Sequence, residues 1–553
     1  MTDTPLTRRY RLGELRRSHC SDANFVVTAR AKHDRLGTFM KNAEDLRAST
    51  TRRRFLLGAP LGVSALSAFT VSEADEAEAA PSEGRDLLEL TATEVVPLLR
   101  SGDLSAERYA QALLDQCRKH RALNAFIWQN EDQVLETARA ADKDRTTKRR
   151  GPLHGLPILI KDNIDTASAP TSAGTPALRD RRPSSDAPVA AKLFSAGAIL
   201  LGKTNMHELA YGITSNNGAF GAVHNPYNPT LIPGGSSGGN GAAIAARMCA
   251  AGLGTDTGGS VRIPSALCGI VGLRPTVGRY PGAGIVPLSY TMDTAGPMAR
   301  SVEDLALLDS VITGQNAALR PISLRGVRLG VPRAFFYENL ESSLAPVVEN
   351  ALATLRRAGC VLVEAGLPDI EKLYATARPP ISYYEMLHDL SDYLLKSGTK
   401  ITAEAAIARI ASPDVKAGYE TYGIGPKAPS REAYETALRE GRPAFQAMYR
   451  SYFRDNNVSA IVFPTTLLPA RPIGDDDSVE LNGQKVPTFG TYLHNTRPMT
   501  TTGIPGMSLP IGLTAAGLPV GLEFDAPSGG DRNLLSLGSA IEKLFGRLPA
   551  PPS

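Results

Sequence analysis

The sequence has few cysteines, a single tryptophan and no excess of charge of either sign. Its 553 residues include five cysteines, and 60 basic residues are balanced by 56 acidic ones. A net charge of +4 is too small to indicate nucleic-acid binding. No C-x-x-C pair occurs, so the sequence predicts neither a zinc site nor a disulfide framework. The cysteines are Cys20, Cys117, Cys249, Cys268 and Cys360.

Long apolar runs and internal repeats are also lacking. The longest apolar stretch, at about residues 55–71, contains Gly58, Pro60 and Gly62 and is shorter than the roughly 20 residues of a membrane-spanning helix. We therefore predict no stable membrane association. A hydrophobic content of 42% with 21% charged residues is ordinary for globular proteins and excludes wholesale disorder and fibrous repeats.

The N-terminal region resembles an export signal. Arginines precede Phe55, the apolar stretch follows, and Ala77-x-Ala79 has the small residues of a cleavage site. The paired arginines resemble the twin-arginine signal of bacteria. We predict an extension and signal peptide over residues 1–79, with Met40 as an alternative start, and a single domain over 80–553. The expected location is the periplasm or the medium, and the alternative is the cytoplasm.

Short apolar strands alternate with helical patterns along the rest of the chain. Residues 157–160 and 198–201 have the pattern of buried strands, whereas residues 189–195 and 242–249 have that of helices. This alternation predicts an α/β fold with a largely buried sheet. Residues 370–455 are mostly helical in pattern and are interpreted as a cap or insertion.

Residues 197–204 match the phosphate-loop expression G-x-x-x-x-G-K-T, but we reject that function. The motif needs a flexible loop between its glycines, after a strand. Here the intervening residues are Ala, Ile, Leu and Leu, which favour a strand themselves. Lys203 is accordingly expected to support the fold.

Two glycine- and serine-rich blocks, residues 233–239 and 254–264, are the strongest chemical signal. Both lie between apolar helix and strand patterns, so they are not linkers. Buried glycines there imply tight turns or backbone N–H groups that are free to face a ligand. An oxyanion site requires such donors, fixed where negative charge will develop.

These blocks, together with residues 153–163 and 517–521, resemble the amidase-signature family of amide hydrolases. The resemblance covers roughly residues 85–530. It implies an amidase-signature fold, in which a mixed central β-sheet is covered by helices on both faces, with a helical cap or insertion. It also implies a hydrolase that acts on linear amide C–N bonds, a small-molecule amide as substrate, and no cofactor or metal. A homodimer is compatible with this interpretation.

The resemblance also implies a role for each residue of the site. Ser260 would be the nucleophile that forms an acyl-enzyme, Ser236 would relay a proton after a cis Gly235–Ser236 peptide bond, and Lys161 would be the base. Backbone N–H groups of Thr257, Gly258, Gly259 and Ser260 would form the oxyanion hole. Supporting positions are Gly235, Ser237 as a hydrogen-bonding neighbour, and Asp256 with Arg262 as an ion pair or loop anchor. Ser260 is also suited to be a helix N-cap.

The proposed base places a physical requirement on its surroundings. A serine hydroxyl is a weak nucleophile until a base takes its proton. A lysine can be that base only when it is neutral, so burial or a nearby positive charge must lower its pKa. The apolar residues 158–160, directly before Lys161, are expected to provide the burial.

Several alternatives remain open from the sequence alone. Residues 234–238 also match G-x-S-x-G, the nucleophile elbow of α/β-hydrolases, and would need a downstream histidine such as His388 or His494 for a Ser-Asp-His esterase triad. Cys268 is interpreted as a core residue rather than a nucleophile. A binding protein that kept the fold and a transamidase subunit are further alternatives, and an export signal argues against the latter.

The substrate is less well defined than the reaction. Residues 217–227 and 268–280 most resemble indoleacetamide and mandelamide hydrolases, which implies a primary amide of an arylacetic acid. We expect aromatic side chains to line an apolar pocket, with Tyr383, Tyr384, Phe489 and Tyr492 as candidates. The export signal departs from those relatives and raises anilides, carbamates and peptide amides as alternatives.

Overall fold

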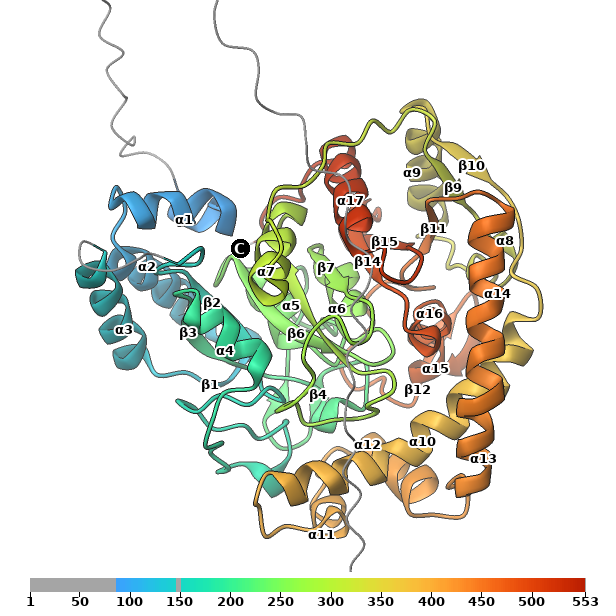
Figure 1. The fold of residues 1–553 in the computed structure, drawn as a ribbon, viewed down its shortest axis with the longest axis horizontal. Helices are drawn as coiled ribbons and strands as arrows, with labels where there is room; N and C mark the ends of the chain where they lie inside the picture. Colours follow the sequence, from blue (N-terminus) through green and yellow to red (C-terminus); the bar gives the residue numbers. More distant parts are fainter. Residues whose placement is uncertain (1–85, 146–150, 553) are drawn as a thin grey trace, which may run out of the picture. The chain divides into compact units, whose positions relative to one another are not determined.

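The computed structural model describes residues 86–145 and 151–552 (Figure 1). The chain divides into two units, Met1–Glu78 and Ala79–Ser553. The predicted signal peptide and the alternative start at Met40 lie outside the described residues, so both stay predictions. Cys20 also lies there, and the other four cysteines are unpaired and buried.

The centre of the second unit is an 11-stranded mixed sheet. In spatial order the strands are β1 (Phe126–Trp128), β3 (Ile199–Thr204), β2 (Pro157–Lys161), β6 (Ala251–Asp256), β8 (Thr294–Ala299), β7 (Val271–Arg274), β14 (Gly506–Leu513), β15 (Pro519–Asp525), β11 (Ala460–Pro464), β9 (Arg328–Gly330) and β10 (Val361–Val363). Strands β3, β2 and β6 run parallel to one another, as do β11, β9 and β10, and the other neighbouring pairs are antiparallel.

Helices pack against both faces of this sheet, which confirms the predicted fold class. Successive residues of a strand point to opposite faces. On β14, Met507 reaches Gly538 of α17 (Asp531–Phe545), while Ser508 lies on the side of α6 (Arg262–Cys268). The layer that contains α6 also includes α5 (Gly238–Ala245), and the layer that contains α17 also includes α7 (Val302–Thr313).

The body also contains helices and two hairpins outside the sheet and the elements named above. They are α1 (Ala92–Ser101), α2 (Ala106–Lys119), α3 (Glu131–Asp144), α4 (Pro188–Ser195), α8 (Arg333–Phe336), α9 (Ala345–Arg357), α15 (Thr488–Leu493), α16 (Arg497–Thr502), and the two hairpins β4 (Asn216–Asn217) with β5 (Gly221–Ala222) and β12 (Ser478–Leu481) with β13 (Gln484–Pro487).

Residues 370–455 are largely helical, as the sequence pattern predicted. They form α10 (Ile370–Lys396), α11 (Ala403–Ala408), α12 (Pro413–Gly418), α13 (Arg431–Thr436) and α14 (Arg442–Asp455), with π-helical turns at Tyr419–Gly423 and Ala437–Gly441. The apolar side chains of α10 share a hydrophobic cluster with residues of the body such as Leu178 and Leu209. The cap therefore packs against the loops that precede the serine-rich block.

Two sequence expectations are corrected or sharpened by these elements. The helix expected over residues 242–249 ends at Ala245, because Arg247 has a positive φ of 63° that no α-helix accommodates. Residues 199–204 form β3, so the rejected phosphate loop is a strand, as argued from its apolar residues. Among the helices of residues 86–145 and 151–552, none is long and apolar enough to span a bilayer.

Candidate active site

Three strand ends meet at one edge of the sheet. Lys161 is the last residue of β2 and Asp256 the last of β6, and the two strands are parallel. Strand β8 runs antiparallel to β6, with Thr294 opposite Asp256, so Asp293 lies at the same edge. Crevices at the carboxyl ends of parallel strands are common ligand sites in α/β proteins.

Lys161 is completely buried and is held by hydroxyl groups rather than by a carboxylate. Its Nζ lies 2.7 Å from Ser236 Oγ and 2.8 Å from Thr255 Oγ1. Within the described ranges it forms no ion pair. Burial lowers the pKa of Lys161 to about 7, although the charges of Asp256 and Asp293 act in the opposite direction. The expected lowering of this pKa by burial is confirmed, and a large fraction of the amine is neutral near pH 7.

Ser236 lies in the tightly packed loop that leads into α5. The Gly235–Ser236 peptide bond is cis, as the resemblance implied. Ser237 Oγ is within hydrogen-bonding distance of both the Thr255 carbonyl oxygen (3.2 Å) and the Thr255 N–H (3.3 Å). A Cβ atom at Gly254 would lie 2.9 Å from Ser237 Oγ, so the close approach of this loop to β6 requires glycine.

Ser260 lies in the short loop that joins β6 to α6. The Ser237 N–H donates to the Ser260 carbonyl at 3.2 Å, so the two serine-containing loops are joined. Gly259 has a φ of 146°, and a Cβ atom there would lie 2.4 Å from Thr496 Oγ1. Helix α6 begins at Arg262 with Val261 as its N-cap, so the expectation that Ser260 is the N-cap was wrong, because the loop continues for one further residue.

The backbone donors of this loop are free of protein partners. In the part of the chain that the structure describes, the N–H groups of Thr257, Gly258, Gly259 and Ser260 donate no hydrogen bond to another protein group. The loop is instead fixed through other atoms, because the Gly258 carbonyl accepts from Thr496 Oγ1 at 2.5 Å and the Gly259 carbonyl from Ile263 N at 2.7 Å. The four donors are therefore available to a ligand.

Asp256 and Arg262 form a buried ion pair, which is one of the two roles that the sequence analysis expected for them, an ion pair or a loop anchor. Arg262 Nε lies 3.0 Å from Asp256 Oδ2, and the same guanidinium contacts Glu523. Arg274 Nη1 lies 3.2 Å from Asp256 Oδ1. These guanidinium groups hold the pKa of Asp256 well below its usual range, against the effect of burial. Because Arg262 is completely buried, it anchors the loop and does not reach the pocket.

Two polar residues of the site were not assigned from the sequence. Thr255 is the second partner of Lys161 and also accepts from Asn163 Nδ2 at 3.1 Å, but in the sequence it is an ordinary strand residue. Asp293 accepts from Thr257 Oγ1 at 2.5 Å, and burial raises its pKa to about 6. The signal available in the sequence was that Asp293 directly precedes strand β8, which begins at this edge of the sheet.

Lys203, the other lysine at this edge, has a structural role. Its Nζ donates to the Ile164 carbonyl at 2.8 Å and to Thr171 Oγ1 at 2.7 Å, and lies 3.5 Å from Asp162. It therefore tightens the loop after β2, as expected, and does not contact Ser236.

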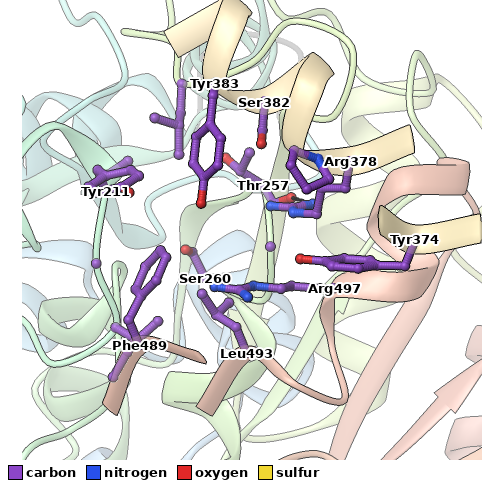
Figure 2. A pocket seen from close by; sticks show the side chains of 16 residues that line it. Tyr211, Thr257, Ser260, Tyr374, Arg378, Ser382, Tyr383, Phe489, Leu493 and Arg497 are labelled. Carbon is purple, nitrogen blue, oxygen red and sulfur yellow. Dashed lines mark hydrogen bonds between the residues drawn. The ribbon is translucent and has the colours of Figure 1, made fainter. Parts of the chain in front are cut away.

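Figure 2 shows the pocket into which the Ser260 side chain points. The pocket contains about 550 Å³ of space between the protein atoms, a volume that includes open solvent at its mouth. Most of its wall is apolar or aromatic, and its lining residues are Ala210, Tyr211, Gly212, Ile213, Thr257, Gly258, Ser260, Leu288, Tyr374, Arg378, Pro379, Ser382, Tyr383, Phe489, Leu493 and Arg497.

Two of the four predicted aromatic residues line this pocket, and two do not. Tyr383 and Phe489 are in the wall. Tyr384, the next residue on α10, points elsewhere and stacks on His388 and Tyr434. Tyr492 is completely buried and its hydroxyl donates to the Pro469 carbonyl at 2.6 Å. Successive helix residues differ by about 100° in direction, and this rotation directs Tyr384 away from the pocket that Tyr383 lines.

The histidine and cysteine alternatives do not fit the structure. His494 Nε2 lies 3.0 Å from the Phe335 carbonyl and His388 Nδ1 2.8 Å from the Tyr384 carbonyl, whereas the recorded side-chain partner of Ser236 is Lys161. Cys268 is buried and burial raises the pKa of its thiol well above the usual range, so it is unreactive. No group of three or more His, Cys, Asp or Glu side chains within residues 86–145 and 151–552 could hold a metal ion.

Comparison with known proteins agrees with this geometry. Residues 108–535 match a family model described as Amidase. The protein is a hydrolase that acts on amide C–N bonds. It belongs to the amidase family, the amidase-signature hydrolases that the sequence motifs indicated.

Its relatives include enzymes for aryl-substituted amides. The chain is 45% identical over 445 residues to the indoleacetamide hydrolase of Agrobacterium vitis, which covers 80% of this chain and 95% of that protein. It is 38% identical over 484 residues to the mandelamide hydrolase of Pseudomonas putida, covering 84% and 93%. Its fold resembles the crystal structure of a peptide amidase from Stenotrophomonas maltophilia, with a TM-score of 0.71, 30% identity and coverage of 84% and 98%.

The buried ion-pair network leads to a prediction about stability. We expect Arg262→Met to lower the free energy of unfolding by about 3–5 kcal/mol, because Asp256 loses one of its two guanidinium partners and Glu523 loses its own. Urea denaturation followed by circular dichroism measures the change. As a control, Arg333→Met breaks a half-exposed pair with Glu349 and should cost less than about 1 kcal/mol. Equal losses in the two variants would contradict the prediction.

Proposed function

We propose that the protein hydrolyses a small aryl-substituted carboxamide, through an acyl-enzyme on Ser260, to a carboxylate and ammonia. One observation carries the proposal. The Nζ atom of the buried Lys161, which has no carboxylate partner among the described residues, lies 2.7 Å from Ser236 Oγ. The loop that contains Ser236 is hydrogen-bonded to the loop of Ser260. A neutral amine in such a place is a base rather than a structural cation.

Acylation begins with two coupled proton transfers. Neutral Lys161 takes the hydroxyl proton of Ser236, Ser236 takes that of Ser260, and Ser260 Oγ forms a bond to the amide carbon. When the tetrahedral intermediate collapses, the carbon–nitrogen bond breaks. The proton held by Lys161 returns through Ser236 to the leaving nitrogen, so ammonia departs as a neutral molecule and Lys161 is neutral again.

Deacylation repeats the same transfers with water. A water molecule gives a proton to the Ser236–Lys161 pair as its oxygen bonds to the acyl carbon. The bond from Ser260 Oγ to that carbon then breaks, and Ser260 recovers a proton by the same route. The products are the carboxylic acid, which ionises, and the unchanged enzyme.

The negative oxygen of each tetrahedral intermediate needs fixed donors. The N–H groups of Thr257, Gly258, Gly259 and Ser260 are unpaired in the described chain, and Thr257 and Gly258 also line the pocket. We assign them the oxyanion hole. Because the carbonyls of this loop are already engaged, the donors need little rearrangement when charge develops.

The pocket wall supports an aryl group as the acyl side chain. Tyr211, Tyr383 and Phe489 face the space next to Ser260 (Figure 2). Aromatic side chains stabilise a bound ring by offset or edge contacts in addition to its removal from water. The relatives that act on indoleacetamide and mandelamide agree with such a substrate. Export through the twin-arginine-type signal remains a separate proposal, based on residues 1–79.

We expect Ser260→Ala to lower kcat/KM for phenylacetamide by at least about 1000-fold, because the variant has no nucleophile for acylation. Hydroxylamine should trap an acyl group as a hydroxamate with the unchanged enzyme but not with this variant. His388→Ala and His494→Ala are controls and should retain most activity. Full turnover by Ser260→Ala, or its loss in either histidine variant, would contradict the assignment.

The pH profile of kcat/KM tests the base. Since the pKa of Lys161 is lowered to about 7, activity should fall about tenfold per pH unit below that value, where the amine is protonated, and level off above it. Lys161→Met should abolish the dependence together with most of the activity. A profile that is flat from about pH 5 to 9 in the unchanged enzyme would exclude a lysine base.

A substrate panel tests the acyl group and the leaving group. We expect arylacetamides to exceed acetamide and hexanamide in kcat/KM, because only a ring fills the aromatic wall. The panel also contains an anilide, a carbamate and a C-terminally amidated dipeptide. A preference for any of these three over phenylacetamide would replace the aryl primary amide as the substrate class.

A further inference from the structure

Two arginine side chains share the pocket with Ser260. Arg378 comes from α10 of the cap and Arg497 from the first residue of α16, and Figure 2 shows both guanidinium groups directed into the pocket. Within the described residues neither has a carboxylate within 4 Å. The neutral aryl amide proposed above leaves these two charges without a function.

The position of Arg378 is fixed by its protein contacts, but part of its guanidinium remains free. Nη1 lies 2.8 Å from Thr500 Oγ1 and 3.3 Å from the Thr257 carbonyl. A Cβ atom at Gly258 would lie 3.0 Å from Nη2, so that nitrogen lies beside the loop of Ser260. In the described chain Nε and Nη2 donate to no protein acceptor.

Arg497 is positioned by an aromatic ring rather than by hydrogen bonds. Its guanidinium carbon lies 4.9 Å from the centre of the Phe489 ring. Stacking of this kind engages the face of the guanidinium and leaves its N–H edge available for a planar acceptor. No hydrogen bond from Arg497 to another described residue is recorded. The N–H groups of this edge are therefore available to a ligand in the pocket.

The surroundings of these arginines do not neutralise them. Arg497 repels Arg378, whereas Tyr374, Tyr383 and the charge of Asp256 act on its pKa in the opposite direction. Burial and this repulsion both lower the pKa of Arg378. The carboxylates of the site are engaged behind the pocket, Asp256 with two arginines and Asp293 with Thr257. Arg378 is buried, and a buried charge beside a second cation in a largely apolar wall is costly unless a ligand supplies an anion.

We propose that Arg378 and Arg497 form a carboxylate subsite, so that the preferred substrate is an aryl amide that also carries a carboxylate. The inference rests on the proposed function, because Ser260 fixes the position of the carboxamide. A carboxylate matches the planar donor edge of a guanidinium in a bidentate manner, which a hydroxyl or a second amide cannot do equally well. The aromatic wall would hold the ring between the two groups.

Binding to the Ser260→Ala protein tests the subsite without turnover. The probes are the meta and para isomers of carbamoylmethyl-benzoate, each compared with the matching carbamoylmethyl-benzamide, a neutral ligand of nearly the same shape. We expect one benzoate isomer to bind about 10- to 100-fold more tightly than its benzamide, as for a hydrogen bond to a charged group. Equal affinity within both pairs would overturn the proposal.

Two variants attribute the preference to its residues. In the Ser260→Ala background, Arg497→Gln should reduce the benzoate preference to less than about threefold, since it removes the free donor edge while affecting no recorded hydrogen bond. Arg179→Gln is the matched control, because Arg179 also stacks on a phenylalanine, Phe220, but outside the pocket. A preference that survives Arg497→Gln, or disappears in Arg179→Gln, would refute the assignment.

The carboxylate could instead be the one that hydrolysis creates. Phenylacetate, the product of a neutral amide, is therefore included as a probe. If phenylacetate binds as tightly as the benzoate and is equally weakened by Arg497→Gln, the arginines hold the product and the proposed substrate class is wrong. If the unchanged enzyme hydrolyses none of these amides but still binds the benzoate, the proposed function is refuted and the carboxylate subsite is not.

In the unchanged enzyme the effect should appear mainly in KM. Arg378→Lys keeps a charge but loses the planar edge, and should raise KM for the benzoate about tenfold or more while changing KM for its benzamide by less than about threefold. A purely structural role through Thr257 and Thr500 would change both substrates to the same extent, and that result would count against the subsite.

Discussion

Burial of an amine without a countercharge is the constraint on which the rest of this site depends. Lys161 is completely buried, and its hydrogen-bond partners among the described residues are the hydroxyls of Ser236 and Thr255, which are neutral. A carboxylate in direct contact would favour the charged amine. The nearby acids have other partners, because Asp256 is paired with two arginines and Asp293 accepts from Thr257.

The same network that occupies Asp256 also holds the loop of Ser260. Arg262 follows that loop and links Asp256 at the end of β6 to Glu523 on β15, two strands that lie apart in the sheet. Burial raises the pKa of Asp525 well above its usual range, and the adjacent charge of Glu523 acts in the same direction.

The sequence located the residues that meet at the strand ends more completely than those that line the pocket, for a physical reason. Lys161, Ser236 and Ser260 lie in contiguous motifs whose glycines and apolar strands already define the local backbone. Thr255 became visible only when the register of β2 and β6 placed it beside Lys161. Arg378 and Arg497 lie more than a hundred residues after Ser260, and only the tertiary packing of the cap and of α16 brings them to the pocket. The end of α5 was missed because it depends on a positive φ at Arg247.

This division follows from how the two parts are built. The body supplies the groups to which proton transfer and charge stabilisation are assigned in the proposal, and each is fixed by a strand end or by a loop whose carbonyls are engaged. The cap supplies Tyr374, Arg378 and Tyr383 from α10, a helix that packs on the body through its own apolar side chains. Exchanging these side chains alters what can be bound without replacing the amine and the two hydroxyls. A family that shares one reaction can therefore diversify in substrate through the cap, and the pair formed by Arg378 of the cap and Arg497 of α16, which has no carboxylate partner among the described residues, is best explained by the ligand.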